Sequence, residues 1–269
     1  MISVKNIAKS FGSSQVLRDI SFNVQSGEKI ALLGPGSSGK STIIKVILGL
    51  MPPDSGNIEL FGEDFLAMKG SQQQQLLRRV GMAFQQGGLF DFMSVYDNLA
   101  FATNHMTDFS SDKSREQISK VLAGVKLPGA DNKFPYELSG GMQKRVGIAR
   151  ALAIEPDIAI FDEPTAGLDP VTSTIILNMI FDLGASKSDR TLMVVTSNVE
   201  VAIRFADRIV MINDGVVVAD GPWRDLILNG DEWVQHYLSV RLIGLDEEYA
   251  QGLHLPKAFI DRHWITRSF

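Results

Sequence analysis

The pattern of apolar and polar residues predicts a strand, a glycine loop and a helix near the start of the chain. Residues 1–65 read as short strands broken by turns, and the run "KIALLG" is apolar at consecutive positions. Such a run is typical of a strand that is buried on both faces. The next run, "KSTIIKVILGL", has helical spacing and stops near Gly49, because Pro52 and Pro53 cannot continue a helix.

Helical spacing prevails from about Gln72 to Leu152, which predicts a helical insert. Strand patterns return in "DIAIFDE" and "TLMVVTS", with a helix through "TSTIILNMIFDLGAS" between them. This order is typical of a parallel βαβ unit and so of an α/β fold. The run "RIVMINDGVVVADG" predicts a hairpin that turns at residues 213–215, and "WRDLILNGDEWVQHYL" predicts a helix laid on the core or on a sister subunit.

The composition excludes several classes of protein to which the chain could belong. The chain has 269 residues, a net charge of -5 and no cysteine, which excludes disulfides and thiolate metal sites. The negative charge argues against nucleic acid as a partner, and the four histidines show no metal-ligand spacing. We see no signal peptide and no run of ~18 apolar residues, so we expect a cytosolic chain that does not cross a membrane by itself.

The strongest motif is "GPGSSGKST", which satisfies the pattern G-x-x-x-x-G-K-[ST] between a predicted strand and helix. Its backbone N–H groups would converge on phosphate oxygens; Lys40 would reach the β- and γ-phosphates and Ser41 would ligate Mg²⁺. The alternative is a plain glycine turn before a helix. The predicted ATP-binding loop comprises Gly34, Pro35, Gly36, Ser37, Ser38, Gly39, Lys40, Ser41 and Thr42.

Two carboxylates end the predicted strand "IAIFDE", at the edge where ligands of open α/β sheets collect. Asp162 would hold Mg²⁺ directly or through water, and Glu163 would act as the general base on the attacking water. The alternative is a helix cap, since Pro164 follows.

A second glycine-rich helix start, "LSGGMQKR", offers further N–H groups to an anion. One nucleotide needs only one phosphate loop. We therefore expect Ser139, Gly140 and Gly141 to serve a nucleotide held by a second copy of the chain, in a dimer that sandwiches two ATP. The alternative is an ordinary serine cap with glycines for tight packing.

Together with the following "AGLD", these motifs resemble the ATP-binding subunits of ABC transporters over residues 1–221. The resemblance implies a P-loop NTPase (RecA-like) core with an antiparallel β subdomain and an inserted α-helical subdomain. The core and β subdomain would be residues 1–85 and 153–221, the helical signature subdomain 86–152, and a C-terminal helical extension 222–269.

The same resemblance assigns further roles. It implies that Phe11 stacks on adenine, although the residue alone could be a core residue, and that Gln85 touches Mg²⁺ and water and links the core to the helical subdomain. Asp169 would contact the opposite subunit. Asn198 stands where the family has a histidine that bonds the γ-phosphate, so we expect slower hydrolysis; the alternative is that Asn198 caps a helix through "VEVAIRFADRI". It could do both.

The stretches "FQQGGLFDFMSVYDNLAF", "LSGGMQKR" and "DEPTAGLDPVTS" resemble the Mla/Mce-type ATPases of lipid transport. This implies transmembrane permease subunits, an MCE-domain lipid-binding protein, and a peripheral place at the cytoplasmic face of the inner (plasma) membrane. Alternatives are the ATPase of a small-solute importer, a soluble ABC protein of ribosomes or DNA ends, and a slow ATP-dependent switch. The apolar residues between 89 and 101 could form core or line a groove for a helix of the membrane subunit.

Overall fold

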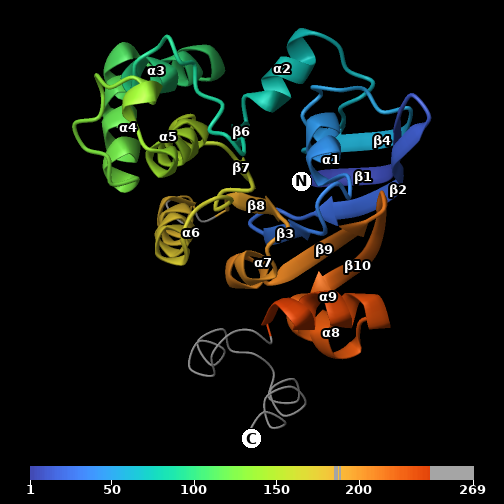
Figure 1. The fold of residues 1–269 in the computed structure, drawn as a ribbon. Helices are drawn as coiled ribbons and strands as arrows, with labels where there is room; N and C mark the ends of the chain where they lie inside the picture. Colours follow the sequence, from blue (N-terminus) through green and yellow to red (C-terminus); the bar gives the residue numbers. More distant parts are fainter. Residues whose placement is uncertain (185–186, 188, 243–269) are drawn as a thin grey trace, which may run out of the picture. The chain divides into compact units, whose positions relative to one another are not determined.

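The computed structural model describes residues 1–184, 187 and 189–242 (Figure 1). These residues fall into two compact units. The first unit holds residues 1–2, 24–28 and the described residues of 58–194, and the second holds residues 3–23, 29–57 and the described residues from 195 on. The C-terminal helical extension predicted over residues 222–269 is described only as far as residue 242, so its last stretch, "LHLPKAFIDRHWITRSF", with two of the four histidines, lies outside the described residues. No helix in the described ranges is both long and apolar enough to span a membrane.

The second unit is built on a mixed sheet whose strands follow the order β1-β2-β10-β9-β3. The strands are β1 (Ile2–Phe11), β2 (Ser14–Val24), β3 (Lys29–Leu33), β9 (Arg208–Asn213) and β10 (Val216–Pro222). β3 pairs with β9 in parallel, and β9 pairs with β10 antiparallel. Asp214 and Gly215 turn this hairpin with positive φ angles of 47° and 75°, which confirms the predicted hairpin.

Four helices belong to the second unit: α1 (Lys40–Ile47), α7 (Val199–Phe205), α8 (Trp223–Asn229) and α9 (Glu232–Leu242). α7 packs on β3, α8 packs on β10, and α9 packs on both α7 and α8. The apolar spacing in the C-terminal stretch buries Trp223, Ile227, Val234 and Leu238. The tail helix predicted from this spacing is therefore present, as two helices separated at Gly230.

The first unit contains the parallel strands that carry the carboxylates. β8 (Thr191–Thr196), β7 (Ile158–Asp162) and β6 (Val80–Ala83) lie in that order, and β7 is buried along its whole length. β4 (Ser55–Leu60) pairs antiparallel with β5 (Glu63–Asp64). The helix α6 (Pro170–Gly184) connects β7 to β8, as the βαβ pattern predicted.

Helices make up the rest of the first unit. They are α2 (Ser71–Leu77), α3 (Val95–Met106), α4 (Ser111–Gly124), the short 3₁₀ helix η1 (Pro135–Glu137) and α5 (Gly140–Ala153). α3, α4 and α5 pack on one another around a shared apolar core (Figure 1). This arrangement agrees with the predicted helical insert.

Two boundaries differ from the sequence predictions. β6 interrupts the stretch predicted to be mostly helical, because a four-residue apolar run has no measurable period and its strand form depends on parallel pairing with β7. Gly81 allows this pairing beside α5, since a Cβ there would lie 2.1 Å from the carbonyl oxygen of Ala151. The helix after Asn198 ends at Phe205 and not at Ile209, because Ala206 is extended and β9 begins at Arg208.

Candidate functional site

The predicted phosphate loop joins β3 to α1 in the second unit, and close contacts require a glycine at two of its positions, Gly34 and Gly39. A Cβ on Gly34 would lie 2.0 Å from the carbonyl oxygen of Ile212 in β9. Gly39 has a φ of 104°, and a Cβ there would lie 2.7 Å from Leu17 Cδ2. The carbonyl of Ser38 also accepts a hydrogen bond from the amide of Gly215, at 3.2 Å. These contacts fix the loop between β3 and α1, and its binding of phosphate stays a prediction.

Lys40 is the first residue of α1, and its side chain folds back over the loop. The residue is 6% exposed, and its ammonium donates to the carbonyl oxygens of Gly34 at 2.9 Å and Pro35 at 2.7 Å. The charge is thus held beside a loop whose amides are suited to an anion. The next residue, Ser41, is exposed and presents a hydroxyl oxygen at the start of the same helix.

The two carboxylates end β7 in the first unit. Asp162 is its last residue and is 8% exposed, and Glu163 follows with a φ of 44°, in the left-handed region that non-glycine residues rarely adopt. The carbonyl of Glu163 accepts a hydrogen bond from the amide of Ala166 at 3.2 Å, which closes a turn. The next helix, α6, begins only at Pro170, so the helix-cap interpretation of these carboxylates is wrong.

The helix start at Ser139 combines a cap with open glycines. Ser139 Oγ accepts a hydrogen bond from the amide of Met142 at 3.3 Å, as the cap alternative predicted. Tight packing, however, does not explain the glycines. A Cβ on Gly140 would meet no atom within 4 Å, and one on Gly141 would have its nearest neighbour at 3.6 Å, an ordinary contact distance. The bare backbone leaves room for a ligand or another chain.

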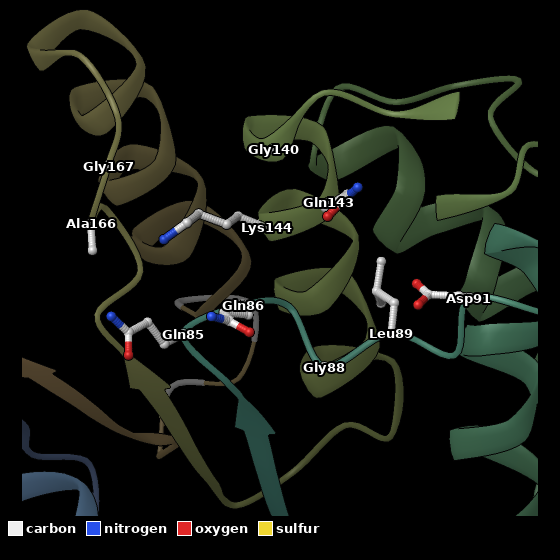
Figure 2. A pocket seen from close by; sticks show the side chains of 10 residues that line it. All are labelled: Gln85, Gln86, Gly88, Leu89, Asp91, Gly140, Gln143, Lys144, Ala166 and Gly167. Carbon is white, nitrogen blue, oxygen red and sulfur yellow. The ribbon is translucent and has the colours of Figure 1, made fainter. Parts of the chain in front are cut away.

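Gln85 lies just beyond β6, on the wall of a cavity of about 660 Å³ within the first unit (Figure 2). Gly140, Gln143 and Lys144 of α5 line the same cavity, as do Ala166 and Gly167 from the turn after the carboxylates. The structure therefore brings the predicted residues Gln85 and Gly140 to one cavity.

Lys144 was missed by the sequence analysis. Its ammonium donates to the carbonyl oxygen of Glu163 at 3.1 Å. Burial lowers the pKa of Lys144, and the neighbouring charges of Glu163 and Asp162 oppose this shift. The only sequence signal was a basic residue one turn into the predicted anion-binding helix, and basic residues at such places usually point to solvent.

Asp169 is exposed and precedes α6, where it orders the first turn of that helix. Its carboxylate accepts hydrogen bonds from the amide of Thr172 at 2.9 Å and from the Thr172 hydroxyl at 2.6 Å. These bonds from Thr172 hold the pKa of Asp169 below its usual value. Its predicted contact with an opposite subunit stays a prediction.

Phe11 and Asn198 belong to the second unit, like the phosphate loop. Phe11 ends β1 and is 47% exposed, so the core alternative for it is wrong and its ring is accessible for stacking. Asn198 is exposed, and its side-chain oxygen accepts a hydrogen bond from the amide of Val201 at 3.3 Å. The cap alternative for Asn198 is thereby confirmed, and its role toward a phosphate stays a prediction. The residue before Asn198, Ser197, is also held in place, since its carbonyl oxygen accepts a hydrogen bond from the hydroxyl of Tyr237 in α9 at 3.3 Å.

The residues predicted to hold Mg²⁺ carry oxygen ligands of the kinds that this ion prefers. These are the hydroxyl of Ser41, the amide oxygen of Gln85 and the carboxylate of Asp162. Among the described residues, no group of three histidines, cysteines or carboxylates could hold a metal on its own. The chemistry of each group fits Mg²⁺, and their joint role in holding one ion stays a prediction.

Comparisons with known proteins agree with these features. The profile of the family described as "ABC transporter" matches residues 17–166. The glutamate/aspartate import ATP-binding protein GltL of Escherichia coli K12 is 40% identical over 222 residues, which are 82% of this chain and 91% of GltL. The probable ribonucleotide transport ATP-binding protein mkl of Mycobacterium leprae is 38% identical over 244 residues, 90% of this chain and 70% of mkl.

A third relative is the intermembrane phospholipid transport system ATP-binding protein MlaF of Haemophilus influenzae, 34% identical over 238 residues, 88% of this chain and 90% of MlaF. Among solved structures, a dimeric ATP-binding cassette in a post-hydrolysis state with ADP and Pi aligns with a TM-score of 0.76 and 30% identity. The alignment covers 82% of this chain and 98% of that chain. These matches confirm the predicted fold class, a P-loop α/β core with an inserted helical part.

Proposed function

Because the chain belongs to the ABC transporter family, we propose that this ATPase powers the movement of phospholipid or another lipid between bacterial membranes, together with an MCE-type partner. The chain is an ATP-binding subunit of P-loop type, and ATP turnover is its activity. The relative MlaF carries the lipid proposal, since it is named for intermembrane phospholipid transport and aligns over nearly the whole of both chains.

In the proposed reaction, two copies close on two ATP. The loop from Gly34 to Thr42 binds the phosphates of one ATP, Lys40 neutralises their charge, and Phe11 stacks on adenine. Ser139, Gly140 and Gly141 of the second copy would complete the site, because their open backbone has room for another molecule's phosphate. The dimeric cassette with ADP and Pi supports this arrangement.

Glu163 is the proposed general base that takes a proton from the attacking water. Asn198 and Gln85 would orient that water by hydrogen bonds, and Asp169 would contact the opposite copy. Mg²⁺, held by Ser41, Gln85 and Asp162, would neutralise charge on the phosphate oxygens when it is bound. ATP would act by binding the closed dimer more tightly than the open one, and separation would follow hydrolysis.

An apolar groove in the first unit is the proposed seat of the permease subunit. It has a volume of about 300 Å³ and includes Phe84, Phe90 and Phe101 among its lining residues. Phe84 is 39% exposed and Phe101 40%, whereas Val95 and Leu99 are fully buried. The predicted apolar set is thus divided between core and groove. A groove of this kind suits the apolar face of a partner helix and would anchor the chain peripherally on the cytoplasmic face of the membrane.

Import of a small solute is the second candidate. The observation that favours it is the 40% identity to GltL, a glutamate/aspartate import protein. The ATP site would be the same in both cases, because the transported molecule contacts the partners and not the ATPase.

The decisive experiment is affinity purification of the membrane complex, followed by identification of its co-purifying chains and lipids. The lipid proposal predicts a permease, an MCE-domain protein and bound phospholipid. A periplasmic binding protein for a small solute in their place would overturn it. As a control on the ATP site, Lys40→Ala should abolish turnover without dissociating the complex.

A further inference from the structure

Lys144 forms a bridge between the signature helix and the segment that carries the proposed general base. It lies on α5, five residues after Ser139, and is half-buried. Figure 2 shows its side chain extending from α5 toward the loop that holds Ala166 and Gly167. Its ammonium donates to the carbonyl oxygen of Glu163 at 3.1 Å.

The backbone that Lys144 contacts is strained. Glu163 has a φ of 44°, a conformation that a non-glycine residue keeps only where its surroundings enforce it. Its carbonyl oxygen accepts two hydrogen bonds, from Lys144 and from the amide of Ala166 at 3.2 Å. The second bond lies within the turn itself, whereas Lys144 reaches the turn from another element. The direction of the Glu163 side chain depends on the backbone conformation that these bonds fix.

The charge of Lys144 strengthens this contact. A hydrogen bond from an ionised donor is roughly twice as strong as one between neutral groups. Burial lowers the pKa of Lys144, while Glu163 and Asp162 favour its charged form. The lysine therefore adds positive charge next to the two carboxylates as well as a hydrogen bond.

We propose that Lys144 is a positioning residue that aims Glu163 and ties its orientation to the placement of the signature helix. This inference rests on the proposed function, in which the start of α5 engages the nucleotide of a second copy. Because α5 is one continuous helix of 14 residues, a displacement at Gly140 is passed to Lys144 one turn on.

Steady-state ATPase kinetics of the full chain test this proposal. Lys144→Met keeps the apolar stem but removes the charged donor, and we expect kcat to fall about 10- to 100-fold while KM for ATP stays within about twofold. Lys144→Arg keeps a charged donor and should recover most of the rate. Lys120→Met is the matched control, since Lys120 is an exposed lysine of α4 in the same unit. A purely structural role predicts instead that Lys144→Met loses folded protein, measured by circular dichroism, in proportion to its loss of activity.

A double mutant separates positioning from any other effect on rate. If Lys144 acts through Glu163, Lys144→Met should change the residual rate of Glu163→Gln less than about threefold, since interacting residues are not additive. A further full loss in that background would overturn the proposal. If turnover survives Lys40→Ala, the proposed function itself fails. If turnover requires Lys40 and Glu163 but Lys144→Met behaves like Lys120→Met, only the inference on Lys144 fails.

Discussion

Substitutions at Asn198 can separate its observed role as a helix cap from its predicted role at the γ-phosphate. The side-chain oxygen of Asn198 accepts a hydrogen bond from Val201, and α7 has only seven residues. Loss of such a cap costs about 1 kcal/mol, within a range of 0.5–2. Asn198→Ala should therefore lower the unfolding free energy by about 1 kcal/mol and the Tm by about 2–4 °C.

The predicted catalytic role ranks the variants by turnover differently from the way the cap ranks them by Tm. Loss of a hydrogen bond to a charged group costs about 1.5–3 kcal/mol, or about 10- to 150-fold in rate if it acts only in the transition state. Asn198→Asp retains the capping oxygen but replaces the amide donor by a negative charge, so it should keep the Tm of the wild type and lose turnover. Asn198→His restores an imidazole, and kcat should rise.

The assays are thermal unfolding and ATP hydrolysis at saturating ATP. The reasoning about the imidazole is refuted if Asn198→His gives no gain in kcat. The role of the amide is refuted if Asn198→Asp retains full turnover, because this variant preserves the cap and replaces the donor by a negative charge that would repel the phosphate. A Tm of Asn198→Ala equal to that of the wild type would contradict the assigned cap energy.

Two further predictions concern stability. Gly34→Ala should lower the unfolding free energy by about 1–3 kcal/mol in urea titration, because its Cβ would lie 2.0 Å from the Ile212 carbonyl oxygen. The control is Gly36→Ala, whose Cβ would meet no atom within 4 Å and which should change this free energy by less than about 0.5 kcal/mol. Equal losses in the two variants would refute the steric argument. Burial raises the pKa of Asp157, but the hydrogen bonds that it accepts from Lys187 and Arg79 outweigh burial and lower the pKa overall. The free energy of unfolding should therefore fall as the pH drops below about 4. Asp157→Asn should weaken this acid dependence in denaturation curves at pH 3–6, and an unchanged slope would show that the ion pairs do not contribute.

The strands and helices that carry the motifs could be predicted from the sequence, because a long apolar run is typical of a buried strand and a glycine-rich segment is typical of a turn. "KIALLG" became β3, "IAIFDE" became β7, and the spacing in "RIVMINDGVVVADG" became a hairpin. Periodicity did not reveal β6, since a run of four residues takes its form from the neighbouring strand. The helix after Asn198 was predicted too long, because Ile209, the first apolar residue of β9, follows Phe205 at helical spacing.

The chemistry of the site was predicted residue by residue, but the contacts among those residues were not. A sequence motif specifies which groups meet a ligand, whereas supporting groups are brought near by the fold. Lys144 contacts Glu163 from a position 19 residues away, and Tyr237 contacts Ser197 from 40 residues away. Neither pairing has a spacing rule, so only the structure could identify it.

The most direct measurement of the central claim is the oligomeric state of Glu163→Gln with and without ATP, determined by light scattering after size exclusion. Removing the proposed general base should leave ATP binding intact and slow hydrolysis to a small residual rate, so the account predicts a monomer without nucleotide and a stable dimer with Mg²⁺ and ATP. Lys40→Ala in the same background should abolish the dimer, because the phosphates would no longer be held. A Glu163→Gln protein that stays monomeric with ATP, or that hydrolyses ATP at the rate of the wild type, would contradict the assignment of a two-copy ATP site with Glu163 as its base.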